Sequence, residues 1–115
     1  MEKLFNSFGI KINKKQLDSF DKYYRLLIEY NGRFNITAIT EKEEVYLKHF
    51  YDSLTIVKSV DLSRYNSLVD IGSGAGFPGM VLKIFFPHLN ITLIDSNNKK
   101  TKFLTELSKK LSLNV

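Results

Sequence analysis

Cysteine is absent from this chain of 115 residues, which excludes disulfides and any zinc or redox site that depends on thiolates. No run of about 18 apolar residues occurs, so no membrane-spanning helix is predicted. Residues 1–8 include Glu2 and Asn6 and have no apolar core segment, so they do not predict a secretory signal peptide. We therefore expect a cytoplasmic protein that contacts no membrane and binds no metal.

The residues that are present suffice for a hydrophobic core and give an excess of positive charge. Hydrophobic residues make up 43% of the chain, and its length corresponds to one domain or part of one. The formal net charge is +5, and residues 97–115 alone contain five lysines against one glutamate. Such a basic surface attracts nucleic acid. A lysine-rich helix face exposed to solvent explains the same pattern, so both interpretations stay open.

Helical periodicity dominates residues 1–65, which we expect to form a helical N-terminal segment. The predicted core face of a first helix consists of Leu17, Phe20, Tyr24, Leu27 and Ile28. This helix is expected to end near Gly32, since glycine is typical of helix ends. A second helix is expected to begin at Thr40, which forms a capping box with Glu43. The predicted apolar face of the second helix consists of Leu47, Phe50, Leu54 and Val57.

Strands and helices alternate in residues 66–115. Residues 68–71 predict a buried strand, which is followed by a glycine-rich loop and by a helix that ends before Pro87. Residues 90–94 predict a second strand, and Ser96 is the expected N-cap of a last helix. The predicted core face of that helix consists of Phe103, Leu104, Leu107 and Leu111. The alternation predicts an α/β fold with two parallel strands.

The loop after the first strand contains Gly72, Gly74 and Gly76. Glycines permit positive φ angles and have no Cβ, so a ligand can lie against the backbone. Asp95, at the tip of the second strand, lies 19 residues beyond Gly76, the usual distance for an acid that binds ribose hydroxyls. Loop and acid together favour an adenosine-containing ligand. A turn that only packs a helix against a strand, with an acid that only caps a helix, is the simpler alternative.

The register of the glycines favours one class of ligand. The stretch from Gly74 to Gly79 matches the dinucleotide fingerprint, but no apolar strand residue stands directly before it. The register that begins at Asp70 places a carboxylate two residues before the first glycine, which suits the cationic groups of S-adenosylmethionine. Pro78 removes one N–H from the helix start and weakens it as a phosphate site. A dinucleotide-dependent oxidoreductase is the less favoured alternative.

Two blocks of sequence resemble one known family. The first block comprises Leu68-Val-Asp-Ile-Gly-Ser-Gly-Ala-Gly-Phe-Pro-Gly79, Ile91-Thr-Leu-Ile-Asp-Ser96 and Lys99-Lys100-x-x-Phe103-Leu104. The second block comprises Asn31-x-x-x-Asn35-Ile-Thr37 and His49-x-x-Asp52-Ser53-Leu54. In this arrangement they resemble the N-terminal half of the 16S ribosomal RNA methyltransferase G family, also called glucose-inhibited division protein B. Tyr30 and Lys48 depart from it, since the family often has tryptophan and arginine there.

The resemblance implies a Rossmann-like S-adenosylmethionine-dependent methyltransferase fold, truncated after two parallel strands, with a helical N-terminal segment. It implies methylation of a guanine N7 in small-subunit ribosomal RNA, with S-adenosylmethionine as the cofactor. The cofactor-binding residues that it implies are Gly72, Gly74, Gly76, Phe77 and Asp95. Asn35, His49 and Asp52 match family motif positions without an assigned chemistry. Structural roles are the alternative, with Asn35 bonded to loop backbone and Asp52 paired with a buried donor. Because N7 has a lone pair and no proton to lose, we expect no catalytic acid or base.

Family chains continue well beyond the second strand. A second chain that supplies the missing half, or a non-catalytic remnant, is therefore an alternative to an active enzyme. Two parallel strands alone leave unpaired backbone groups at both edges, and half of the helices that would cover both faces of a parallel sheet are missing. We accordingly expect the apolar residues of both strands to be partly exposed and the chain to be marginally stable. Lys99, Lys100 and Lys102 either contact RNA phosphates or form a solvated helix face.

Overall fold

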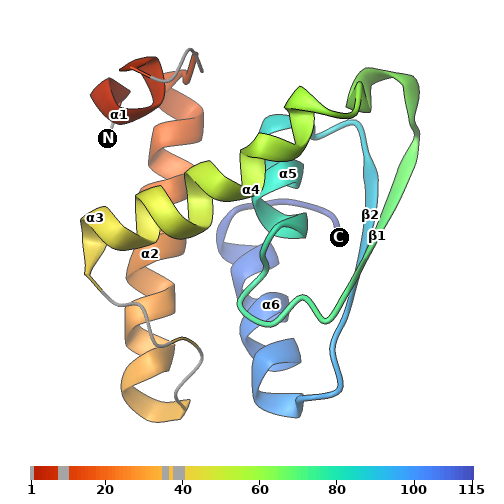
Figure 1. Ribbon diagram of the computed structural model, residues 1–115. Helices are drawn as coiled ribbons and strands as arrows, with labels where there is room; N and C mark the ends of the chain where they lie inside the picture. Colours follow the sequence, from red (N-terminus) through yellow and green to blue (C-terminus); the bar gives the residue numbers. More distant parts are fainter. Residues whose placement is uncertain (1, 8–10, 35–36, 38–40) are drawn as a thin grey trace.

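A computed structural model describes residues 2–7, 11–34, 37 and 41–115 (Figure 1). The predicted α/β fold, with a helical N-terminal segment and two parallel strands, is confirmed. In chain order the elements are α1 (Glu2–Ser7), α2 (Lys14–Phe34), α3 (Lys42–Glu44), η1 (Val45–Tyr51), α4 (Asp52–Leu54), η2 (Thr55–Lys58), η3 (Leu62–Arg64), β1 (Ser67–Ile71), α5 (Gly79–Phe85), β2 (Asn90–Ile94) and α6 (Asn98–Lys110). Within the described ranges, no helix is long and apolar enough to cross a membrane.

Helix α2 is slightly longer than predicted, and the predicted core face is confirmed only at Phe20 and Leu27. It continues through Gly32 to Phe34, so the predicted end was wrong. The Phe34 ring stabilises the last turn, because it packs 5.9 Å from Tyr30 of the same helix and its centre lies 5.4 Å from the ammonium group of Lys99. The buried residues of α2 are Phe20, Tyr23, Leu26, Leu27 and Tyr30. Of the predicted face, Leu17, Tyr24 and Ile28 are only half-buried.

A continuous helical rod runs from α3 to η2 and crosses α2 (Figure 1). The predicted N-cap Thr40 lies outside the described residues, and Glu41 occupies the cap position without a side-chain cap bond. The middle of the rod, η1, is a π-helix, whose wider turn shifts the side chains out of α-helical register. The predicted core positions Leu47 and Val57 are therefore exposed, which corrects the prediction. The predicted core positions Phe50 and Leu54 are confirmed as buried, and Val45 and Tyr46 are buried in addition.

The two strands pair in parallel, with Leu68 opposite Ile91 and Asp70 opposite Leu93. Asp70 and Ile91 are buried on the face toward the helices, which lie to one side of the strand pair (Figure 1). On the opposite face the exposed fractions of Val69, Ile71 and Ile94 are 58%, 80% and 48%. The expected partial exposure of the strands is thus confirmed.

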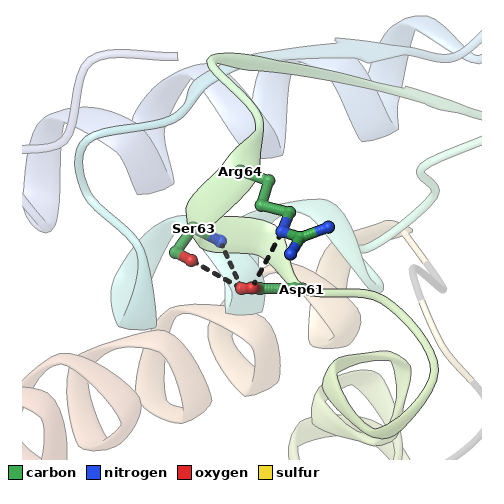
Figure 2. A network of polar contacts seen from close by, with 3 residues as sticks. All are labelled: Asp61, Ser63 and Arg64. Atoms are coloured by element: carbon green, nitrogen blue, oxygen red, sulfur yellow. Dashed lines mark hydrogen bonds and ion pairs between the residues drawn. The ribbon is translucent and has the colours of Figure 1, made fainter.

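The turn before β1 is organised by one carboxylate (Figure 2). The Oδ1 atom of Asp61 accepts hydrogen bonds from the backbone N–H of Ser63, at 3.1 Å, and from the Ser63 hydroxyl, at 2.5 Å. Arg64 places its Nε atom 3.6 Å from Asp61 Oδ2. These contacts hold the turn η3 closed, so that the chain leaves it extended at Tyr65 and enters the sheet.

Helix α6 begins one residue later than predicted. Asn97, and not Ser96, is its N-cap, because Asn97 Oδ1 accepts from the backbone N–H groups of Lys99 at 2.9 Å and Lys100 at 3.2 Å. Asp95 fixes this start by accepting the backbone N–H of Asn97 at 2.8 Å. The predicted core face of the helix, which consists of Phe103, Leu104, Leu107 and Leu111, is buried.

Candidate functional site

The glycine loop between β1 and α5 is fastened to the end of β2. The backbone N–H groups of Gly72 and Ser73 donate to the carbonyl of Ile94 at 2.7 and 3.1 Å. Gly72, Gly74 and Gly76 have φ angles of +77°, +54° and +99°, a region that strongly favours glycine. The sequence prediction that this loop needs glycine for its conformation is therefore confirmed.

The three loop glycines differ in what surrounds them. A Cβ added to Gly72 would meet no heavy atom within 4 Å, and one added to Gly74 would lie 4.0 Å from Lys100 Nζ. A Cβ on Gly76 would instead collide with the Tyr23 hydroxyl and lie 3.0 Å from Met80 Cβ. Gly72 and Gly74 therefore leave main chain open to a ligand, whereas Gly76 is packed against the helices.

Asp95 lies beside the open part of the loop. Its Oδ2 atom accepts the backbone N–H of Gly74 at 2.8 Å, and its Oδ1 atom accepts that of Asn97 at 2.8 Å. The hydrogen bonds from Asn97 and Gly74 hold the pKa of this carboxyl below its usual value, against a small opposing effect of burial. The carboxylate is thus ionised and joins the tip of β2 to the loop, a contact that the sequence did not predict.

Asp70 faces the first turn of α5. Its Oδ2 atom accepts the backbone N–H of Gly79 at 3.0 Å, and its side chain is buried. A Cβ on Gly79 would come within 2.8 Å of the same oxygen. The acid that begins the glycine motif therefore holds the loop against the helix, a structural role that the sequence prediction missed.

Phe77 forms the middle of a stack of three rings from three segments of the chain. Its ring lies 5.6 Å from Tyr23 of α2, at an interplanar angle of 1°, and 4.2 Å from His49 of η1, at 7°. The Tyr23 hydroxyl, buried among the helices, donates to the carbonyl of Ala75 in the loop. Burial, and next the charge of Asp70, raise the pKa of Tyr23. The stack thus connects the N-terminal helices to the glycine loop.

His49 is half-buried and hydrogen-bonded. Its Nε2 atom lies 3.2 Å from Thr37 Oγ1. Burial lowers the pKa of His49, and the charge of Asp52 opposes this effect. The third motif position, Asn35, lies outside the described residues.

A cavity of about 390 Å³ opens beside Phe77 and Pro78, at the far end of the loop from Gly72. The other residues that line it come from the helical rod and the turn after it: Lys48, His49, Asp52, Ser53, Thr55, Ile56 and Ser59. The motif residues His49 and Asp52 thus line the same cavity as the end of the glycine loop. Among the residues that the structure describes, no cluster of three or more histidine, cysteine or acidic side chains could hold a metal ion.

The lysines of α6 do not form one patch. Lys100 reaches the loop, where its charge helps to lower the pKa of Asp95. Lys99 lies over the ring of Phe34, and Lys102 is exposed. Of the predicted phosphate contacts, only Lys100 is beside the candidate site in the described part of the chain.

Comparisons with known proteins agree with this arrangement. A family model described as rRNA small subunit methyltransferase G matches residues 16–115. Ribosomal RNA small subunit methyltransferase G of Bacillus subtilis (strain 168) is 51% identical over 105 residues, which are 91% of this chain and 44% of the relative. The proteins of the same name from Bacillus velezensis and from Exiguobacterium sp. are each 50% identical over the same shares. This chain thus spans less than half the length of these curated relatives, and it belongs to the rRNA small subunit methyltransferase G family.

Proposed function

We propose that the protein containing this chain transfers a methyl group from S-adenosylmethionine to N7 of a guanine in small-subunit ribosomal RNA, in the cytoplasm. The observation that carries the proposal is the open main chain of Gly72 and Gly74 beside the ionised carboxylate of Asp95. The family match supports methyl transfer as the reaction, and the names of the relatives support ribosomal RNA as the substrate.

The residues at the loop fit an adenosine-containing sulfonium compound. Gly72 offers backbone without a side chain to the methionine part of the cofactor. Each oxygen of Asp95 accepts one N–H and retains a lone pair for a ribose hydroxyl. The main chain of Gly74, which is open where a Cβ would stand, lies next to that acid. Gly76 and Phe77 support the site indirectly, because Gly76 lets Tyr23 approach and Phe77 forms the wall toward the cavity.

When bound, S-adenosylmethionine supplies an electrophilic methyl group, and its sulfur takes the electron pair of the bond that breaks. The accepting N7 has a lone pair and carries no proton, so the chemistry requires no general base. The contribution of the protein is to bring the two reactants together and to supply fixed charges around them. Asp95 positions the ribose, and Gly72 permits the methionine part of the cofactor to lie close to the backbone.

The test is a calorimetric titration of the purified chain with S-adenosylhomocysteine. We expect saturable binding that is lost in Gly72→Asp, because a side chain then fills the open backbone. Gly32→Asp is the matched control, since Gly32 also has nothing within 4 Å of an added Cβ but lies in α2. Equal binding by both variants would contradict the proposed site. NAD is the competing ligand, and preferential binding of NAD would favour the oxidoreductase alternative.

A second candidate, one half of a two-chain methyltransferase, is favoured by the uncovered outer face of the sheet at Val69, Ile71 and Ile94. In this arrangement residues 1–65 form the helical segment, and residues 66–115 the first half of a Rossmann-like domain. The test mixes the chain with the part of the Bacillus subtilis relative that lies beyond the matched region. Association measured by size-exclusion chromatography, together with methyl transfer by the mixture alone, would support this candidate.

A further inference from the structure

The cavity beside Phe77 shares its wall with the proposed cofactor site, on which this inference rests. Phe77 and Pro78 line the cavity, and Gly72 and Gly74 stand at the other end of the same short loop. Its volume, about 390 Å³, lies within the range of small-molecule pockets, roughly 300–1,000 Å³. A group held there therefore contacts the same loop as the proposed methyl donor without occupying its site.

Asp52 differs from the other acids around the loop. Asp70 and Asp95 accept backbone hydrogen bonds from Gly79 and Gly74. Within the described part of the chain, the Asp52 carboxylate accepts no hydrogen bond and forms no ion pair, and its side chain is exposed. Of the described residues that line the cavity, Asp52 alone carries a carboxylate. An acceptor with unused lone pairs is thus available to a ligand in this cavity.

Lys48 brings a positive charge to the same wall. It lines the cavity four residues before Asp52, and its ammonium has one weak partner in the described chain, Glu44 Oε2 at 3.9 Å. An exposed pair at this distance contributes little to stability. The wall of the cavity therefore carries both a donor and an acceptor.

A carboxylate and an ammonium group together match the Watson–Crick edge of guanine. A base that is methylated at N7 must be held by another edge, so that N7 stays free. The Watson–Crick edge of guanine presents the O6 acceptor, then the N1–H donor, then the N2 amino donor. A carboxylate accepts from the two neighbouring donors, and an ammonium donates to O6. Adenine offers a donor where guanine has O6 and an acceptor where guanine has N1–H, so the same wall rejects it.

We propose that Asp52 and Lys48 bind the Watson–Crick edge of the target guanine in this cavity and thereby select guanine over adenine. His49, stacked on Phe77 at 4.2 Å, keeps the adjoining wall flat. The carboxylate also favours the reaction itself, because the base becomes cationic when N7 forms its new bond, and a negative charge on N1–H stabilises that charge. Asp52 is thus a specificity-determining residue that touches the substrate.

The experiment titrates the 15N-labelled chain with guanosine, inosine and adenosine 5′-monophosphates and follows the amide signals of His49, Asp52 and Phe77 by NMR. We expect guanosine monophosphate to bind about tenfold more tightly than adenosine monophosphate, a usual discrimination for a bidentate contact. Inosine monophosphate, which lacks the N2 amino group, should bind with intermediate affinity. Asp52→Asn should abolish the preference, since an amide presents one acceptor and one donor in place of two acceptors. Lys48→Gln should weaken guanosine monophosphate binding through O6.

Asp18→Asn is the matched control, since it makes the same change at an exposed acid of α2, away from the cavity. Binding that is equal for the guanine and adenine nucleotides, absent for both, or unchanged in Asp52→Asn would overturn the inference. A titration of the same variants with S-adenosylhomocysteine separates this result from the proposed function. If only the guanine assignment fails, S-adenosylhomocysteine binding persists; if the proposed function fails, that binding is absent as well.

Discussion

At the scale of single residues, Gly76 shows how closely the loop approaches the N-terminal helices. We expect Gly76→Ala to lower the free energy of unfolding by about 1–3 kcal/mol, because φ is +99° and the new Cβ would collide with Tyr23 and crowd Leu104 at 3.1 Å. Urea unfolding followed by circular dichroism measures the change. In the control Gly32→Ala, within α2, the added methyl group meets nothing, so a gain of about 0.5–1 kcal/mol is expected.

The lowered pKa of His49 predicts that the stability of the chain depends on pH. Burial lowers its pKa in the folded chain, so the unfolded state takes up the proton first as the pH falls. The stabilisation is therefore fully present above the unfolded pKa of about 6.5 and is lost below it. The free energy of unfolding should decrease as the pH is lowered from about 7.5 to about 5.5. His49→Gln should flatten this slope; a slope that is unchanged in this variant would contradict the assignment.

The residues of the candidate site were predictable to different degrees. Gly72, Gly74 and Asp95 follow from local sequence, because positive φ angles and the tip of a parallel strand leave a recognisable pattern. The role of Tyr23 depends on contacts with residues distant in the sequence, which no local pattern contains. Its helical spacing of three residues from Phe20 would have placed it on the buried face, but not against Ala75.

At the scale of elements, the side chain of Asn97 caps the start of α6. Asn97→Ala should destabilise the chain by about 1 kcal/mol, because it removes the acceptor for the N–H groups of Lys99 and Lys100. The neighbouring Ser96→Ala should change the stability by less than about 0.5 kcal/mol. Thermal melts of both variants measure the difference. A larger loss of stability in Ser96→Ala than in Asn97→Ala would instead identify Ser96 as the N-cap, as the sequence predicted.

The strands and α5 were predicted closely, whereas the helical rod was not. Glycine, proline and alternating burial mark the boundaries of β1, α5 and β2 within the chain itself. In the rod, the π-helical turn of η1 moves Leu47 to the surface and buries Tyr46. Aromatic packing selects this turn, since Tyr46 and Phe50 both lie within 6.4 Å of Phe20. Such a preference arises between elements, so the 3.6-residue period could not reveal it.

At the scale of the whole molecule, the outer face and edges of the sheet predict self-association. We expect the chain alone to show a sedimentation mass that rises with concentration, because unpaired strand edges attract other strands. Ile71→Lys should keep it monomeric at little cost in stability, since that side chain is 80% exposed. Val57→Lys, on the helical rod, should leave the association unchanged. A wild-type chain that is a monomer with a cooperative melt would contradict the expected marginal stability.

The packing of α2 against α6 has a consequence for the order in which the protein can fold during synthesis. Tyr30 of α2 packs 5.3 Å from Phe103 of α6, so the helix made early is covered by a helix made much later. At about 5–20 residues per second, the ribosome needs about 4–15 s to add the intervening chain. During that interval the part of the α2 face around Tyr30 is without its native cover from α6. The end of α2 near Tyr30 therefore exposes apolar surface to other molecules until α6 has been made.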